Sequence, residues 1–148
     1  MIKGKRGEKV EYRFTIYGVP IPKARPRLAR GGHTYTPERT REYEEHVLKC
    51  FYEVYRKDLR LKCPLEVYMK FYLPIPKGDS KAKRKAKEEG FIRPTKKPDC
   101  DNLIKAVSDA LNGHLYEDDS QIIKVSGEKF YSEKPRCEVV IYGEDESE

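Results

Sequence analysis

Apolar and polar residues alternate over two separate stretches of this chain, residues 10–18 and 65–73. A period of two places every second side chain on the same face of an extended backbone, so both stretches are predicted to be β-strands with one buried face. The residues on that face are Val10, Tyr12, Phe14 and Ile16, and then Leu65, Val67, Met69, Phe71 and Leu73. The fold must therefore contain a sheet with an apolar side, and a second layer has to cover it.

Two further stretches space their apolar residues as helices do. Thr36 is a favoured N-cap and Pro37 a favoured first helical residue, so a helix is predicted from there to about residue 57. A second apolar stripe over residues 102–112, followed by a glycine, predicts another helix. Residues 79–90 are almost purely polar, which leaves a surface helix or a mobile loop open.

The last alternating stretches are residues 121–131 and 136–143, and the polar S-E-K-P turn between them predicts a hairpin. This order of strands and helices lacks a regular βαβ repeat. We therefore expect an α+β fold, a single domain with a mixed, mostly antiparallel sheet and helices packed on one face. Residues 1–143 would form this domain, and the acidic residues 144–148 a disordered tail.

Positive charge is concentrated in two short segments, although the net charge of the chain is only +6. Residues 23–41 hold six basic side chains against one acid, and residues 77–97 hold nine against three. Such clusters are typical of proteins that neutralise phosphates, so a nucleic-acid partner is favoured. Two solvated loops of a highly charged protein remain the alternative.

The four cysteines form no C-x-x-C pair, which disfavours a structural zinc site and a disulfide framework. No apolar run approaches the ~18 residues that a membrane span requires, and the first residues contain no apolar signal segment. We therefore expect a cytoplasmic protein that contacts no membrane and binds no small-molecule cofactor.

The most informative segment is residues 96–122, which contains two groups of acids. Pro98 favours an extended backbone, and a helix that starts just after Asp101 would leave Asp99 and Asp101 on an extended segment. Both carboxylates would then point to the same side. Lys105 lies one helical turn beyond Asp101 and would face the same space.

The second group of acids follows the helix. After Gly113 the chain turns, and Asp118 and Asp119 come just before the next strand. This return would bring them beside the first pair, where converging carboxylates would repel each other unless a cation bound them. Mg²⁺ takes carboxylates, waters and phosphate oxygens as ligands, so the pattern indicates metal-dependent phosphodiester hydrolysis.

Each of these residues also has a purely structural interpretation. Asp101 could be an N-cap, and Asp99 could interact with the helix dipole. Lys105 and Asp109 could form an ordinary i, i+4 ion pair, and the second acidic pair could belong to a turn. The combination of all of them around one helix is what favours a metal site.

Several segments, in the same order along the chain, resemble the RusA-type Holliday junction resolvases, most closely the branch from Gram-positive bacteria and their phages. They are P-I-P-K-A-R-P-R at 20–27, Y-T-P-E-R-T-R-E-Y-E at 35–44, P-I-P-K-G at 74–78, K-P-D-C-D-N-L-I-K-A-V-S-D-A-L-N-G at 97–113, the acidic pair before Gln121, and Lys129 with Tyr131. The resemblance implies a homodimeric endonuclease that uses Mg²⁺, with Mn²⁺ as a substitute. It would place paired nicks across a four-way DNA junction.

The resemblance also implies which residues are catalytic: Asp99, Asp101 and Asp119 as the acids and Lys105 as the lysine. Asp118 is counted with the metal ligands. Two residues depart from the family pattern, because Asp79 follows P-I-P-K-G where an aromatic residue or serine is expected, and Cys100 replaces an aliphatic residue.

The residues expected to contact DNA phosphates are mostly in the two positive segments: Lys23, Arg25, Arg27, Lys81, Lys83, Arg84, Lys85 and Lys129. Asn102 and Gln121 are expected to orient the acids. Three other functions stay open: a nuclease with broader specificity for flaps and forks, a non-catalytic protein that binds branched DNA, and a phosphatase for small substrates. The fifteen basic residues of the two segments argue against the last, because a small phosphate requires few cations.

Overall fold

The alternating stretches form a four-stranded sheet in the computed structural model, which describes residues 8–24, 27–32, 34–35 and 37–144. The strands are β1 (Lys9–Tyr17), β4 (Leu65–Pro74), β5 (Ile122–Ser132) and β6 (Arg136–Glu144), in the spatial order β1-β6-β4-β5. β6 is antiparallel to both of its neighbours, whereas β4 and β5 run parallel. The expected α+β fold with a mixed, mostly antiparallel sheet is confirmed.

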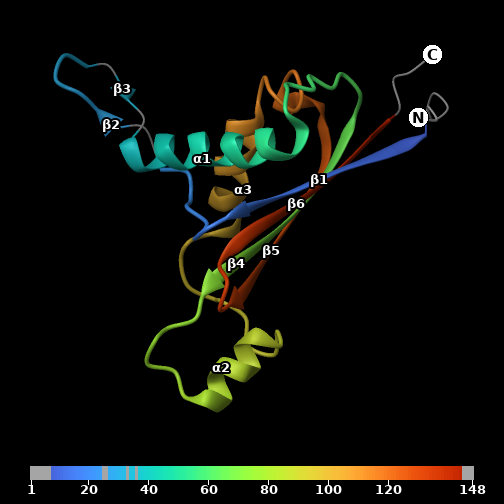
Figure 1. Cartoon of the computed structure of the whole chain (residues 1–148). Coiled ribbons are helices and arrows are strands. Elements are labelled where there is room, and N and C mark those ends of the chain that lie inside the picture. Colours follow the sequence, from blue (N-terminus) through green and yellow to red (C-terminus); the bar gives the residue numbers. More distant parts are fainter. Residues whose placement is uncertain (1–7, 25–26, 33, 36, 145–148) are drawn as a thin grey trace.

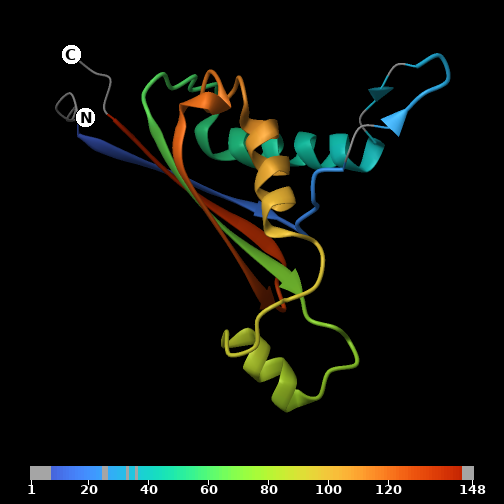
Figure 2. The ribbon, with the colours of Figure 1, turned by 180° about the vertical axis from the view of Figure 1, so that it is seen from behind.

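Two helices, α1 (Glu38–Tyr55) and α3 (Cys100–Leu111), cover one face of the sheet and contact each other (Figures 1 and 2). Phe51 of α1 packs edge-on against Phe14 of β1, with ring centroids 5.7 Å apart. Leu103 and Val107 of α3 are almost completely buried in the same core. The apolar stripes of both helices thus provide the covering layer that the sheet requires.

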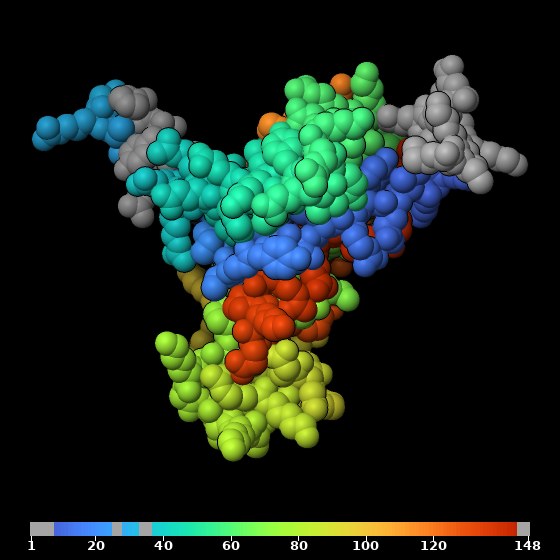
Figure 3. All heavy atoms as spheres, viewed as in Figure 1, coloured from blue at the N-terminus to red at the C-terminus, as the bar shows by residue number. Residues whose placement is uncertain are grey.

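Two smaller elements project from this body (Figures 1 and 3). One is the ribbon of β2 (Arg27–Leu28) and β3 (Thr34–Tyr35), which leads into α1. The other is α2 (Lys81–Glu88), beyond the end of the sheet where β4 finishes. The polar segment 79–90 is therefore a surface helix, with the Ser80 hydroxyl accepting a hydrogen bond from the backbone N–H of Lys83 at its start.

The predicted hairpin of residues 121–131 and 136–143 is wrong, because β4 lies between β5 and β6. The central positions go to the strands that bury most of their apolar residues. Cys137, Val139 and Ile141 of β6 are at most 1% exposed, whereas Ile123 and Val125 of β5 are 72% and 48% exposed. A strand with so little buried surface suits an edge of the sheet, and sequence proximity does not decide its neighbour.

Smaller differences concern the ends of the elements. Pro37 is the N-cap of α1 and not its first helical residue, and Thr36 lies outside the described residues. β6 includes Glu144, one residue beyond the predicted domain end, and residues 145–148 are not among those described. Within the described ranges, no helix has the length and apolar character needed to cross a membrane.

Candidate active site

The amino end of α3 carries the first pair of acids. Asp99 is the N-cap, with an extended backbone (φ −72°, ψ 144°), and its carbonyl accepts the first helical hydrogen bond from Leu103 N–H at 3.1 Å. Asp101 therefore lies in the first helical turn, and the prediction that α3 starts after Asp101 is wrong. The two exposed carboxylates are two positions apart around the start of a helix, so they do not share one side of an extended segment.

The loop that leads to Asp99 is fastened to β5 from both sides. The Lys129 amine donates hydrogen bonds to the carbonyls of Lys96 and Pro98, at 2.8 and 2.9 Å. In return, the Arg93 side chain donates to the carbonyl of Lys129 at 2.6 Å and stacks over the Phe130 ring at 3.8 Å. Lys129 thus holds the backbone next to Asp99, whereas the sequence suggested a contact with phosphate.

Lys105 is exposed one turn beyond Asp101, on the same side of α3, as expected. Its amine lies 3.8 Å from the Asp109 carboxylate, so the ion pair considered as a structural alternative is present. Because the Lys105 side chain is mostly exposed, this contact is weak and leaves the amine available to a bound phosphate.

The second pair of acids starts η1 (Asp119–Gln121), a short 3₁₀ helix before β5. Asp118 caps it by accepting a hydrogen bond from Ser120 N–H at 3.0 Å, and the Gln121 side chain accepts one from Asp118 N–H at 2.9 Å. The Gln121 amide also donates to the carbonyls of Leu61 and Cys63. Gln121 therefore ties the acidic turn to the body of the protein, and its role in orienting catalytic acids stays a prediction.

Hydrogen bonds from Ser120 and then from Asn112 lower the pKa of Asp118 below its ordinary value. Asp118 is thus ionised at neutral pH. The contact with Asn112 also locates the turn, because Asn112 is the C-cap of α3.

The two pairs of acids consequently lie at opposite ends of α3. Asp99 caps one end and Asp118 contacts the other, and a helix of 12 residues is roughly 18 Å long. Among the described residues, no group of three or more His, Cys, Asp or Glu side chains is close enough to hold a metal ion. The expectation that the return after Gly113 would unite all the acids within one chain is wrong.

Comparison with known proteins adds to this geometry. Residues 18–142, which include both pairs of acids, match the family model "Endodeoxyribonuclease RusA". The chain belongs to the RusA endodeoxyribonuclease family. It is also 40% identical over 134 residues to "Uncharacterized protein YqaN" of Bacillus subtilis (strain 168), a match that covers 87% of this chain and 94% of the relative. Membership of the RusA family implies endonuclease activity and DNA as the partner.

The basic residues of this RusA-family chain differ in how freely they can meet DNA. Those of α2 at Lys81, Lys83 and Lys85 are exposed. Arg84 is half-buried and lies 3.1 Å from the Glu133 carboxylate. Lys87 is buried in an ion pair with Asp79 and lies over the Tyr131 ring. The family departure at Asp79 therefore has a structural role, since this pair fixes the start of α2 to its last turn.

The basic segment near the amino terminus also contains a lysine that is held in ion pairs within the protein. The Lys23 amine lies 2.6 Å from Glu44 and 3.2 Å from Asp109, so it joins α1 to α3, and its predicted contact with DNA stays a prediction. Arg25 lies outside the described residues, as does the side chain of Arg27. The predicted DNA contacts of these two arginines stay predictions.

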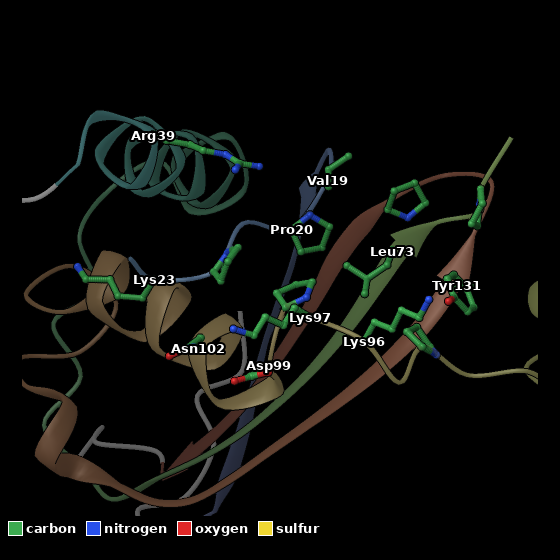
Figure 4. Close-up of a pocket in the computed structure, with 15 residues that line it drawn as sticks. Val19, Pro20, Lys23, Arg39, Leu73, Lys96, Lys97, Asp99, Asn102 and Tyr131 are labelled. Carbon is green, nitrogen blue, oxygen red and sulfur yellow. The ribbon is translucent and has the colours of Figure 1, made fainter. Parts of the chain in front are cut away.

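Sequence reasoning missed a cavity of about 590 Å³ beside Asp99. It lies between the start of α1, the segment after β1, the loop before α3 and the ends of β4 and β5 (Figure 4). Arg39, Lys96 and Lys97 line it, and none of them had been singled out. Asn102, expected to orient the acids, also lines this cavity. The P-I-P segments at 20–22 and 74–76 were the available signal, because both contribute to its walls.

Proposed function

We propose that this RusA-family protein resolves Holliday junctions with Mg²⁺ by paired nicks, as a homodimer in which each metal site uses acids from both protomers. The observation that carries the proposal is the separation of the two pairs of acids at opposite ends of α3. The family resemblance places Asp99, Asp101 and Asp119 in one site, but among the described residues of one protomer no three acids lie close enough to share a metal. A second copy of the chain can supply the other pair.

The outer edge of β5 is where a second copy would bind. β5 pairs with β4 on one side, and no strand of the described chain lies on the other. A Cβ atom on Gly127 would meet Ile104 of α3 at 2.6 Å, so Gly127 faces the helical layer. Ile123 and Val125 face the same way because side chains alternate along a strand. Two exposed, large apolar side chains on an unpaired edge favour association.

Antiparallel pairing of two β5 strands about a two-fold axis near Val125 would give hydrogen-bond partners to the unpaired backbone groups of this edge. Residue 121 of one copy would then lie opposite residue 129 of the other. Gln121 holds the turn of Asp118 and Asp119, and Lys129 holds the loop that ends at Asp99. This pairing would bring the acidic turn of each protomer towards the amino end of α3 in the other, and it would do so twice by symmetry.

The donor set fits the proposed metal. All four candidates are carboxylates, which are the oxygen ligands that Mg²⁺ and Mn²⁺ prefer. The bound ion would supply Lewis acidity and lower the pKa of an attacking water. Hydrogen bonds lower the pKa of Asp118 below its ordinary value, which favours the charged form that binds a metal ion. Lys105, one turn from Asp101, would stabilise negative charge on the non-bridging oxygens of the scissile phosphate.

Two sites related by a two-fold axis also account for paired nicks. A four-way junction has two-fold symmetry when its arms stack in pairs, so two equivalent strands can each reach one site. The exposed lysines of α2 would contact backbone phosphates, which position the arms without reading their sequence.

The test mixes two inactive variants, Asp101→Asn and Asp119→Asn, and measures nicking of a labelled four-way junction with Mg²⁺ or EDTA. Each variant alone should lose at least about a hundred-fold in rate, because each removes a charged metal ligand. In a mixed dimer, one site would carry both substitutions and the other would carry none. Mixing should therefore restore nicking, in one strand per junction.

Each result has a definite meaning. No recovery in proven mixed dimers would contradict shared sites. Equal cutting of a flap and a junction would support nuclease activity but contradict specificity for four-way junctions. Junction binding without cutting under Mg²⁺ or Mn²⁺ would favour a non-catalytic branched-DNA-binding protein.

A further inference from the structure

The cavity beside Asp99 has walls made largely of proline. Its fifteen lining residues include six of the ten prolines of the chain: Pro20, Pro22, Pro74, Pro76, Pro94 and Pro98. Proline has no backbone N–H and a restricted φ, so these walls present rigid, flat CH surfaces with few hydrogen-bond donors. Leu73, which is buried, and Tyr131 add further apolar surface. Such walls can pack against the two faces of a flat ring.

The rim of the cavity is cationic. Arg39 on α1 and Lys96 and Lys97 before α3 are exposed, and none of the three forms an ion pair with another described residue. Figure 4 shows Arg39 on one side of the opening and Lys97 on another, close to Asp99. Unpaired cations around an apolar cavity complement a ligand that has a flat ring and an attached anion.

A nucleotide has this combination of a flat base and a phosphate. The volume of about 590 Å³ is within the usual range for small-molecule sites and is ample for one base and its sugar. Asp99 lines the cavity and is also a proposed metal ligand, so a base held here would belong to a nucleotide next to the scissile phosphate.

We propose that this cavity receives one unstacked nucleotide of the cleaved DNA strand, next to the nicked bond. The inference rests on the proposed nuclease function and names a base-binding subsite for it. When a bound junction opens, stacking between its arms is lost at the branch point, so a base there leaves the helix more readily than a base inside a duplex. The subsite would therefore favour branched over linear DNA and would hold the scissile phosphate against the acids.

The experiment places 2-aminopurine, whose fluorescence rises on unstacking, in turn at each nucleotide flanking the branch point of a four-way junction. Binding is measured with the Asp101→Asn protein, so that the junction stays intact. A second substitution, Val19→Trp, fills the cavity from its mouth, where Val19 is 46% exposed. The matched control is Val54→Trp on α1, because Val54 is similarly exposed (52%) and does not line the cavity.

Folding and placement can be checked in the same samples. The chain contains no tryptophan, so the emission of each variant reports the surroundings of its single indole. The indole at residue 19 should emit at shorter wavelength than the one at residue 54, which points into solvent.

We expect a several-fold rise in 2-aminopurine fluorescence at one flanking position. The rise should be lost with Val19→Trp and kept with Val54→Trp. No rise at any flanking position on a saturated junction, or a rise that persists with Val19→Trp, would overturn the subsite. Nicking by the native protein without a rise would reject only the subsite. A rise in a protein that never cuts would keep the subsite and reject the proposed nuclease.

Discussion

Replacing Lys129 with methionine tests whether this lysine holds the active-site loop or contacts DNA. Methionine keeps the length and apolar stem but removes the two hydrogen bonds to the carbonyls of Lys96 and Pro98. Hydrogen bonds from a charged donor are worth about 1.5 to 3 kcal/mol each. A single amine makes both hydrogen bonds, and water can replace that amine at the carbonyl of the exposed Lys96. We therefore expect Lys129→Met to lower stability by about 2 kcal/mol.

The loss should be concentrated where Lys129 acts. The amide of Leu103 makes the first hydrogen bond of α3, to Asp99. A local loss of about 2 kcal/mol corresponds to roughly thirty-fold faster hydrogen exchange at that amide. If the whole loss appears in global unfolding instead, Tm should fall by about 4 to 8 °C. Nicking should slow because Asp99 is less firmly placed.

DNA binding separates the two roles of Lys129. A lysine that contacts phosphate contributes about 0.9 to the slope of log affinity against log salt, so a lost contact would lower that slope. We expect an unchanged slope for Lys129→Met. Lys124→Met is the control, since Lys124 is on the same strand but lies over Tyr68, on the open face of the sheet. Unchanged exchange at Leu103 together with a lower slope would refute the role assigned to Lys129.

Three further outcomes follow from the geometry. Gly127→Ala should cost about 1 to 2 kcal/mol in chemical denaturation, because its Cβ would lie 2.6 Å from Ile104, and adding Ile104→Val should recover part of that loss. Ile123→Glu should give monomers without nicking activity in sedimentation and junction assays, while Val54→Glu should change neither; an active monomer would contradict the shared site. Asp118→Asn, in EDTA, should lower Tm at neutral pH. The pKa of Asp118 is below its ordinary value of 3.8, so the difference in Tm between the native protein and the variant should be full above about pH 5. It should vanish as acid protonates the carboxylate in the folded protein. A difference in Tm that does not depend on pH would show that the hydrogen bonds to the charged carboxylate are not its cause.

The sequence predicted the faces of the strands well because burial imposes a period of two, which is visible in a single chain. It could not predict the neighbours of those strands. The alternating patterns of β5 and β6 are compatible with a hairpin. β4 lies between them because the strands with the most apolar surface to bury take the central positions of the sheet, and this depends on all four strands together. The exposed Ile123 and Val125 were counted as ordinary strand residues, although they mark β5 as the edge.

The candidate acids could be found from residue type and spacing, but their arrangement depended on where α3 starts. A shift of the helix start from residue 102 to residue 100 changes Asp101 from an extended to a helical residue. The contacts of Lys23 and Lys129 could not be predicted from the sequence, for a different reason. A lysine next to prolines or on a strand has the same sequence signature whether its amine meets phosphate, a carboxylate or a backbone carbonyl.

The separation of the acids along α3 has a consequence for how such an enzyme would be controlled. If Asp99 and Asp101 of one protomer must meet Asp118 and Asp119 of the other, a lone protomer has no complete metal site and cannot nick DNA. Activity would then rise with dimer formation, and both sites would form together because one two-fold axis creates both. Coupled sites make a single unpaired nick less frequent, since a dimer that can cut one strand can also cut the other. Dilution below the dimer dissociation constant should therefore abolish all nicking, and it should not leave a population that nicks one strand.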